Sequence, residues 1–481
     1  MGKHKRFSAT VAMLALLSAC GGGGGGGGDG TIVVPPPTTP PPAQTAGCSL
    51  RERQDWAAAQ LREWYLFPDL LATSANPANY SSVQDYIDAL VAPARAQNRD
   101  RFFTYVTSIQ EENAFYESGS SAGFGFRLAL DASNRLLISE SFEDTPALAA
   151  GIDRGTEIVA IGTSTGNLRT VSSIIASEGS AGLNNALGPA TIGTSRTFQV
   201  RDLNGATRTV TIAKAEYEID PVSARYGARI INDGGKNVGY INLRTFIGPA
   251  NTALRSAFAQ FKAAGITEVI VDFRYNGGGL VSVAELLSNL LGGGRSTSDV
   301  LSYTTFRAEK AVNNQTDFFA PLPESINATK IAFIGTGSSA SASELVMNAF
   351  IPYLRGNTAL IGSNTYGKPV GQIAIDRPAC DDRLRVIAFA TQNADRQGDY
   401  FTGLASKFQT TCRATDDITR PLGDPQEASI RAALDFLGGR QCTPITSTAT
   451  TQGLREGMGR GDLLLPEQPT GTIQRELPGS Y

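Results

Sequence analysis

The stretch "KIAFIGTGSSASASELVMNAFIPYL", residues 330–354, combines a short apolar run, a glycine-containing turn and a helical pattern. An apolar run of this length bounded by turn residues is typical of a buried strand, and the spacing that follows is typical of an amphipathic helix. Ser341 and Glu344 fit the S/T-x-x-E capping box that begins many helices. The stretch therefore predicts a strand, a tight turn and a helix that begins near Ser341.

The same order of elements recurs on the N-terminal side of this stretch. Strand-like runs and helical patterns alternate in "NVGYINLRTF" (237–246), "NTALRSAFAQFKAAG" (251–265), "TEVIVDFR" (267–274) and "LVSVAELLSNLL" (280–291). This alternation is typical of α/β folds, in which helices cover the faces of a central sheet. We therefore expect an α/β core within residues 216–442, in a chain that is an α+β multidomain protein overall.

Composition divides the rest of the 481-residue chain into further segments. One segment is dominated by amphipathic helical patterns, and another by strand-like runs with glycine turns. The linker and the tail are rich in Gly, Pro and Thr. The expected segments are a signal peptide (1–20), a linker (21–47), a helical N-terminal domain (48–118), a β-rich domain (119–215) and a low-complexity tail (443–481). We expect that tail to be poorly ordered.

The first residues, "MGKHKRFSATVAMLALLSAC", have the basic start and short apolar run of a signal peptide. The run is too short to span a bilayer as a mature helix. Its end, Leu17 to Cys20, resembles the lipobox of bacterial lipoproteins, in which the cysteine becomes the lipidated N-terminus. We expect a bacterial cell-envelope protein anchored through Cys20, in the outer membrane because Gly21 and not Asp follows. An ordinary signal peptide with a chance cysteine is the alternative.

The four cysteines other than Cys20 indicate disulfides, because an even number in an exported chain is typical of an oxidising compartment. Four cysteines allow three connectivities. We favour Cys380–Cys412, which would close one long excursion, and Cys48–Cys442, which would tie the first domain to the end of the last. Their spacing contains no C-x-x-C or similar metal-binding motif, so we expect no metal.

Histidine occurs only once in the sequence, as His4 within the expected signal peptide. This excludes a Ser–His–Asp triad, a Cys–His pair and a histidine-ligated zinc from the mature protein. The formal net charge is −3 and there is no long basic run, which argues against nucleic acid as the main partner.

A serine at a helix N-terminus, such as Ser341, is a candidate nucleophile because the first N–H groups of the helix face an oxyanion on its substrate. Without histidine, its base must be Lys, Asp or Glu. Lys368 follows an apolar strand within "GSNTYGKPVGQ" (362–372). This stretch almost matches a phosphate-binding G-x-x-x-x-G-K-[ST] loop, but Pro369 replaces the residue whose hydroxyl would hold Mg²⁺. A buried lysine with a lowered pKa is the interpretation that fits a base, whereas a simple helix cap is the structural alternative for Ser341.

Three motifs resemble those of the carboxyl-terminal processing proteases, the tail-specific peptidases of family S41. They are "DFRYNGGG" (272–279), "SASASE" (339–344) and "YGKPVGQ" (366–372), in the order of the family and in its strand–turn–helix context. The resemblance covers about residues 49–440 when the helical and β-rich segments are included. It implies a serine endopeptidase that uses a Ser–Lys dyad and needs no cofactor.

The resemblance also implies a role for individual residues. Ser341 would be the nucleophile, Lys368 the general base, and Gln372 the residue that orients the lysine. The backbone N–H groups of Gly279 and Ala342 would donate to the oxyanion.

One departure from the family pattern leaves the nucleophile open. The gap between Ser341 and Lys368 is 27 positions (368 − 341), a little longer than is usual. Either the chain holds a small insertion there, or Ser343 is the nucleophile. We prefer Ser341, because the motif places Glu344 three residues after it.

The β-rich segment resembles a PDZ domain. Its helix–turn–strand signature matches "PALAAGIDRGTEIVAIG" (146–162), and its carboxylate-binding loop corresponds to Gly123, Phe124, Gly125 and Phe126. Successive N–H groups of such a loop hold a chain-terminal carboxylate, and the peptide adds as a strand to the sheet edge. The resemblance suggests apolar protein tails as ligands. A glycine-rich hairpin with structural phenylalanines is the alternative.

These observations together favour a membrane-anchored serine endopeptidase that binds protein or peptide substrates by their C-terminus. The rival from another class is a peptide-binding lipoprotein that lacks catalysis, and a nucleotide-binding protein comes third. The oligomeric state stays open.

Overall fold

The computed structural model describes residues 46–446, 462–466 and 471–481. The expected signal peptide, Cys20 and almost all of the expected linker lie outside these residues. The described residues form four β-sheets with helices packed on them. None of the helices in the described ranges is long and apolar enough to cross a membrane.

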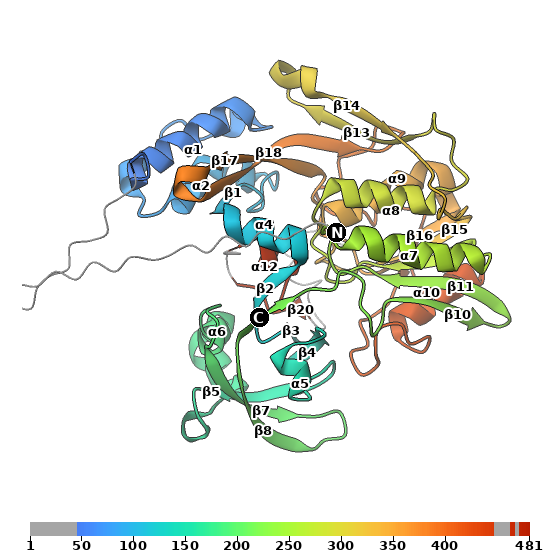
Figure 1. The fold of residues 1–481 in the computed structure, drawn as a ribbon, viewed down its shortest axis with the longest axis horizontal. Helices are drawn as coiled ribbons and strands as arrows, with labels where there is room; N and C mark the ends of the chain where they lie inside the picture. The colour runs from blue at the N-terminus through green and yellow to red at the C-terminus, as the bar shows by residue number, and fades with distance from the viewer. Residues whose placement is uncertain (1–45, 447–461, 467–470) are drawn as a thin grey trace, which may run out of the picture. The chain divides into compact units, whose positions relative to one another are not determined.

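A six-stranded sheet forms the α/β core that the sequence predicts, in the strand order β10-β11-β12-β15-β16-β19 (Figure 1). Neighbouring strands are parallel except for the antiparallel pair of β10 and β11. The strands are β10 (Ala228–Asp233), β11 (Lys236–Asn242), β12 (Glu268–Asp272), β15 (Lys330–Gly335), β16 (Thr358–Gly362) and β19 (Thr410–Arg413).

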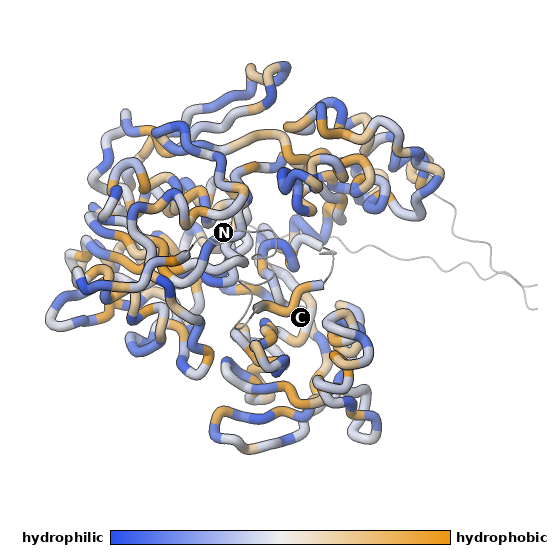
Figure 2. The backbone as a smooth tube through the Cα atoms, turned by 180° about the vertical axis from the view of Figure 1, so that it is seen from behind, coloured by the Kyte–Doolittle hydropathy of each residue, from blue (hydrophilic) through white to orange (hydrophobic). Residues whose placement is uncertain are grey.

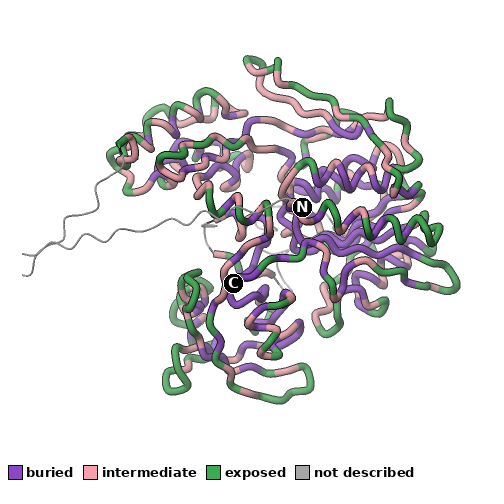
Figure 3. The backbone as a smooth tube through the Cα atoms, viewed as in Figure 1, coloured by how far each residue is buried: buried purple, intermediate pink, exposed green. Residues whose placement is uncertain are grey.

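Alternate residues of this sheet pack against helices on opposite faces, because neighbouring side chains of a strand point to opposite sides. Val269 and Val271 of β12 share an apolar cluster with α7, α8 and α9, whereas Ile270 between them packs with α10. These helices are α7 (Ala250–Ala263), α8 (Val281–Leu291), α9 (Ala342–Leu354) and α10 (Ala428–Leu437). The inner strands β11, β12, β15 and β16 are hydrophobic and largely buried (Figures 2 and 3), which is why they read as apolar runs in the sequence.

The second sheet joins segments that the sequence analysis assigned to different domains. Its strand order is β1-β18-β13-β14, and β17 also pairs with β18. The helices of the expected helical domain pack on β17 and β18 through one apolar cluster, so this region is not separate from the core. The elements are α1 (Leu50–Trp64), α2 (Val83–Leu90), α3 (Ala92–Ala96), β1 (Tyr105–Ser108), α4 (Ile109–Ser118), β13 (Val300–Phe306), β14 (Gln315–Phe318), β17 (Val370–Arg377) and β18 (Asp382–Gln392).

The β-rich segment contributes most of a third sheet, in the order β20-β3-β4-β5-β7-β8, with β6 on β5. A small fourth sheet pairs β2 with β9. The elements are β2 (Ser120–Gly123), β3 (Phe126–Leu130), β4 (Leu136–Ser141), α5 (Pro146–Ala149), β5 (Glu157–Gly162), β6 (Arg169–Thr170), α6 (Val171–Leu187), β7 (Ser195–Arg201), β8 (Thr207–Ala213) and β9 (Ala215–Glu218). Helix α6 and the strands of the third sheet share one apolar cluster.

The expectation of a poorly ordered tail over 443–481 is wrong for its described parts. Strand β20 (Asp462–Leu463) pairs with β3, and helix α12 (Thr472–Glu476) lies beside α4. Leu464 is 2% exposed and Leu477 is fully buried. Leu464 lies in a run of only three leucines and Leu477 stands alone among polar residues, so neither forms a periodic pattern that would predict its packing.

Two disulfides form, but not between the expected partners. Cys48 pairs with Cys380 and Cys412 with Cys442, at Cα–Cα distances of 5.5 Å and 5.3 Å. The pairs Cys380–Cys412 and Cys48–Cys442 are therefore wrong. The physical reason is that the turn between β17 and β18 lies beside the start of α1, while the chain after α10 returns next to β19.

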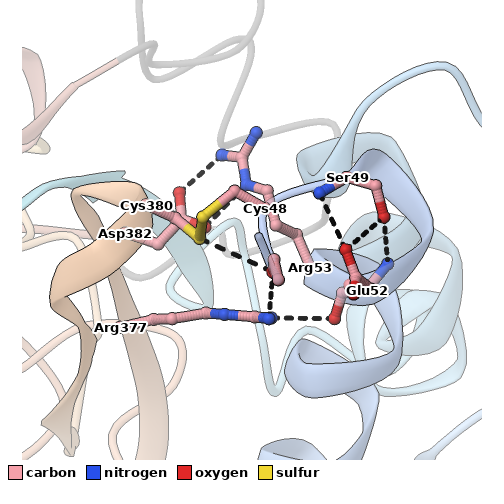
Figure 4. Close-up of a disulfide and its surroundings, with 8 residues drawn as sticks. Cys48, Ser49, Glu52, Arg53, Arg377, Cys380 and Asp382 are labelled. Carbon is pink, nitrogen blue, oxygen red and sulfur yellow. Dashed lines mark hydrogen bonds and ion pairs between the residues drawn. A yellow bond between two sulfur atoms is a disulfide. The ribbon is translucent and has the colours of Figure 1, made fainter. Parts of the chain in front are cut away.

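Polar contacts surround the Cys48–Cys380 disulfide (Figure 4). Arg53 of α1 donates two hydrogen bonds to Asp382, at 2.6 Å and 2.5 Å, and Arg377 donates to the backbone carbonyl of α1 at 2.8 Å. The disulfide therefore joins α1 to the β17–β18 turn where ion pairing already holds the two together.

Replacing both Cys412 and Cys442 by serine should lower the free energy of unfolding by about 3 kcal/mol, because the disulfide closes a loop across 30 positions. The unfolded chain regains the entropy that the loop closure removes. Urea unfolding of the oxidised double variant against the oxidised parent measures this loss. Equal unfolding midpoints, or linked peptides other than Cys48–Cys380 and Cys412–Cys442 in an unreduced digest, would contradict the pairing.

Candidate active site

Ser341 lies between β15 and α9, at the N-cap of the helix. Its backbone has φ 53° and ψ −113°, a region that residues other than glycine rarely adopt. Such a conformation costs about 1–3 kcal/mol and persists where surrounding structure enforces it, most often at functional sites. The residue is partly exposed and lies at the start of the helix.

Ser343, the alternative nucleophile, has a buried side chain that is already hydrogen-bonded. Its side chain is fully buried, and its hydroxyl donates a hydrogen bond to the Asn276 carbonyl at 3.2 Å. An attack by Ser343 would require this bond to break and a buried side chain to reach the substrate. The geometry therefore favours Ser341.

The glycine turn after Asn276 approaches Ser341 so closely that side chains have no room. A β-carbon on Gly278 would lie 2.8 Å from the Ser341 Cβ, and one on Gly279 would lie 2.3 Å from the nearest carbonyl oxygen. Within the described residues, the N–H groups of Gly279 and Ala342 have no protein acceptor. Both groups are therefore free to donate to an oxyanion formed at Ser341.

Buried ion pairs hold the start of this turn. Arg274 is fully buried and pairs with Asp272 at 2.7 Å, with Glu427 at 2.9 Å and with Asp416 at 2.9 Å. Arg154 of the β-rich segment pairs with the same Asp416 at 2.6 Å. Burial works against the charged carboxylate, but Arg154 and Arg274 outweigh it and lower the pKa of Asp416 to about 2. In the described part of the chain, no three or more His, Cys, Asp or Glu side chains are grouped to hold a metal ion.

Sequence reasoning missed this network almost entirely. Asp272, Arg274 and Arg154 belong to quoted motifs, whereas Asp416 and Glu427 lie far away along the chain and carry no local pattern. An unpaired charge would be costly in the interior, so a buried arginine implies partners without revealing which residues they are.

Lys368 comes from the loop before β17, in the second sheet. Its Nζ donates a hydrogen bond to Gln372 Oε1 at 2.9 Å and lies 5.1 Å from the centre of the Phe103 ring. The Gln372 amide in turn donates to the Phe103 carbonyl. Burial lowers the pKa of Lys368, which favours its neutral amine. The structure thus brings Lys368 and Gln372 together and directs the amine to the amide oxygen.

The structure does not join Ser341 to Lys368 directly. Among the described residues, no hydrogen bond connects Ser341 Oγ with Lys368 Nζ, and the amine donates instead to Gln372 Oε1. Catalytic hydrogen bonds are often long or misaligned in the absence of substrate and tighten when it binds. Ser341 follows β15 of the six-stranded sheet, and Lys368 precedes β17 of the second sheet. Their approach therefore depends on what holds the Lys368 loop to α9.

Glu344 provides that connection. Its buried carboxylate accepts hydrogen bonds from the Thr365 hydroxyl at 2.6 Å, from the Gly367 and Lys368 N–H groups at 2.7 Å each, and from the Ser341 N–H at 3.1 Å. Burial raises the pKa of Glu344, and these four donors act against that rise. The sequence predicted Glu344 only as part of a capping box and missed its contacts with the lysine loop, which no helix pattern encodes.

Replacing Glu344 by glutamine should lower kcat by about 10–100-fold, because part of the carboxylate becomes an NH₂ group facing N–H donors and the lysine loop shifts. The measurement is the pH-dependent rate of peptide cleavage, together with the melting temperature. Glu309→Gln is a matched control, since that side chain is largely exposed and away from the loop. An unchanged kcat in Glu344→Gln would contradict the positioning role.

The Gly-Phe-Gly-Phe loop binds a segment of the same chain. The N–H groups of Phe124 and Gly125 donate to the Tyr481 carbonyl oxygen at 2.9 Å and 3.0 Å. A β-carbon on Gly123 would lie 2.7 Å from the Tyr481 carbonyl carbon. The side chains of Phe124 and Phe126 are instead fully buried in the domain core. The loop therefore contacts the bound segment through its backbone and not through its aromatic rings.

Comparisons with known proteins bear on the site around Ser341. Residues 237–397 match the model of peptidase family S41. A carboxyl-terminal-processing protease of Picosynechococcus sp. is 25% identical over 265 residues, which cover 54% of this chain and 58% of that protein. The chloroplastic carboxyl-terminal-processing peptidase 3 of Arabidopsis thaliana is 26% identical over 343 residues, 68% of this chain and 61% of that protein. The chain thus spans about three fifths of the length of these relatives.

A solved structure shares the fold. An S41 protease from Bacteroides fragilis superposes with a TM-score of 0.61 at 24% sequence identity, covering 80% of this chain and 97% of that chain. This likeness supports a mixed α/β multidomain arrangement with several sheets. At 24% sequence identity, this structural similarity is evidence for the fold alone.

Proposed function

Residues 237–397 belong to peptidase family S41, and from this premise we propose that the protein is a serine endopeptidase of the carboxyl-terminal processing type. Ser341 is the nucleophile, Lys368 the general base, and Gln372 the residue that holds the lysine amine. No cofactor takes part in the proposed reaction.

The reaction begins when Ser341 Oγ attacks the scissile carbonyl and Lys368 takes the hydroxyl proton. The negative charge of the tetrahedral intermediate accepts hydrogen bonds from the Gly279 and Ala342 N–H groups. The lysine then passes its proton to the leaving amine, which breaks the peptide bond and leaves an acyl group on Ser341. Water hydrolyses this ester, and the enzyme returns to its starting state.

One observation carries the proposal. The strained Ser341 backbone, the side-chain-free turn at Gly278 and the Glu344 contacts to the lysine loop all converge at the start of α9. A helix cap alone requires neither a positive φ nor a glycine turn against its hydroxyl. A nucleophile with an adjacent oxyanion site requires both an exposed hydroxyl and free N–H groups.

The β-rich segment is the proposed substrate receptor, of PDZ type. Its Phe124 and Gly125 N–H groups would hold the C-terminal carboxylate of a substrate protein, whose last residues would add as a strand to β3. Their hydrogen bonds to the Tyr481 carbonyl support this mode of binding. Substrates would thus be exported proteins with accessible tails.

The experiment that tests the proposed function uses one unfolded protein in two forms, with a free C-terminus and with an amidated C-terminus. We expect the purified protein to cleave the free form faster, because only a carboxylate satisfies the loop fully. Product masses give the cleavage sites. Absence of cleavage in both forms would contradict the peptidase assignment, and equal rates would contradict recognition of the tail.

The proposed location is the bacterial outer membrane, on its periplasmic side, through lipid on Cys20. Replacing Cys20 by serine should move the protein from the membrane fraction to the soluble periplasmic fraction, since the lipid is the proposed anchor. Immunoblots of the two fractions measure this shift. Unchanged fractionation of the variant would contradict lipid anchoring.

A further inference from the structure

The residues before and including Tyr481 occupy the edge of β3 as a peptide ligand would. Tyr481 N–H donates to the Phe126 carbonyl at 3.0 Å, and Leu128 N–H donates to the Gly479 carbonyl at 2.9 Å. Ser480 forms an antiparallel bridge with Arg127. Strand addition of this kind, combined with a backbone loop at the end of the added strand, is a known mode of peptide recognition.

The Tyr481 side chain has specific polar and apolar contacts. Its hydroxyl donates a hydrogen bond to Asn184 Oδ1 of α6 at 2.5 Å and also contacts the Leu464 carbonyl at 3.0 Å. The ring packs against the cluster that contains α6 and the third sheet. The segment thus lies between β3 and α6, and the groove matches a terminal phenol.

The same segment also reaches the candidate active site. Gly277, in the glycine turn, donates its N–H to the Glu476 carbonyl of α12 at 3.0 Å. A β-carbon on Gly277 would lie 1.9 Å from the Arg475 carbonyl oxygen. Tyr116 holds the Glu476 carboxylate through a hydrogen bond of 3.1 Å. The backbone of α12 is therefore packed directly on the turn that carries the proposed oxyanion donor.

The segment places two opposite charges near the candidate base. Burial lowers the pKa of Lys368, the Glu476 carboxylate acts to raise it, and the Arg475 guanidinium of the same helix acts to lower it. One oxygen of Glu476 is buried and has no hydrogen-bond partner among the described residues. A buried carboxylate that is only partly satisfied stabilises the docked segment less than a fully bonded one would. Docking of the segment is therefore compatible with release.

From these contacts we propose that the segment 471–481 is an intramolecular ligand that occupies the peptide groove and the glycine turn together, so that substrates compete with it. This proposal rests on the proposed peptidase function. The bound segment also indicates the ligand class of the groove, which is a peptide with an aromatic residue that carries a hydroxyl group at the position of Tyr481. A tethered ligand has an effective concentration of up to about millimolar, so it excludes weak substrates and yields to strong ones.

The test compares the parent chain with a variant that lacks residues 471–481. Peptide binding is measured by anisotropy with a labelled peptide of the sequence of residues 473–481, in a Ser341→Ala background that prevents cleavage. Cleavage of an unfolded protein is measured with Ser341 intact. We expect the truncated variant to bind the peptide at least about tenfold more tightly than the parent chain and to cleave at least about tenfold faster.

Two point variants keep the proposal testable if the truncated variant fails to fold. Tyr481→Ala removes only the anchoring side chain and should also bind the added peptide more tightly than the parent. Leu465→Ala, at an exposed position of the same tail, should behave like the parent. A peptide that ends in Phe should bind about fivefold more weakly than the peptide that ends in Tyr, because it lacks the hydrogen bond to Asn184.

The outcomes separate this proposal from the proposed function. Tighter peptide binding in the variants without cleavage by any of them would support the intramolecular ligand and contradict the peptidase. Cleavage by all of them with equal peptide binding and equal rates would contradict the intramolecular ligand and leave the peptidase intact. A folded truncated variant that binds the peptide more weakly than the parent would also overturn the ligand proposal.

Discussion

Replacing Ser341 by alanine should reduce cleavage of an unfolded protein by about 10⁴-fold or more, since removal of a catalytic nucleophile leaves only binding and the oxyanion donors. The hydroxyl of this partly exposed residue, at the strained start of α9, is the group that the mechanism requires. The readout is the initial cleavage rate under substrate saturation. Binding of a free C-terminal peptide should stay unchanged, because the peptide groove lies in the β-rich segment.

The matched control is Ser343→Ala, two residues away in the same turn of α9. It removes one hydrogen bond to the Asn276 carbonyl and should lower stability slightly while the cleavage rate stays within a few-fold of the parent. An active Ser341→Ala protein beside an inactive Ser343→Ala protein would show that the nucleophile has been assigned to the wrong serine.

Replacing Lys368 by arginine should reduce cleavage by about 10³-fold or more, because a guanidinium keeps its proton and cannot act as a base. The longer, planar side chain would also lose the hydrogen bond to Gln372 Oε1. The measurement combines cleavage with nucleotide binding on this one variant, since a phosphate-binding loop would keep some anion affinity with arginine. An active Lys368→Arg enzyme would end the general-base assignment.

The pH dependence of the parent enzyme follows from the same lysine. Burial lowers the pKa of Lys368 in the folded protein. The amine is the active form, so activity should rise with pH along one ionisation and be lost as the pH falls below it. The midpoint should lie below the value of about 10.4 that free lysine shows.

Local patterns were sufficient to predict the α/β core and the candidate site residues. The inner strands β11, β12, β15 and β16 are largely buried and therefore appear as apolar runs, and the turn glycines and Ser341 lie in short contiguous motifs. Lys368 and Gln372 are also close in sequence, with Lys368 in the loop before β17 and Gln372 within the strand. These features depend on neighbours along the chain, which a single sequence displays.

Features that depend on distant contacts were not predictable in this way. The disulfide partners depend on which turns meet in space, and Cys48 and Cys380 are separated by 332 positions. Glu344 gains its contacts to the lysine loop only when two sheets come together. Tyr481 docks through backbone hydrogen bonds, for which its polar surroundings in sequence give no apolar pattern.

The central claim, that Ser341 forms a covalent acyl intermediate, is tested most directly by trapping that intermediate. A peptide ester is mixed with the protein, the reaction is quenched with acid, and the acylated peptide is sequenced by mass spectrometry. A variant that lacks residues 471–481 serves as a second sample in which the groove is open. The account predicts one acyl group on Ser341 in both samples and none in Ser341→Ala. An acyl group on Ser343, or turnover of the ester with full activity in Ser341→Ala, would contradict it.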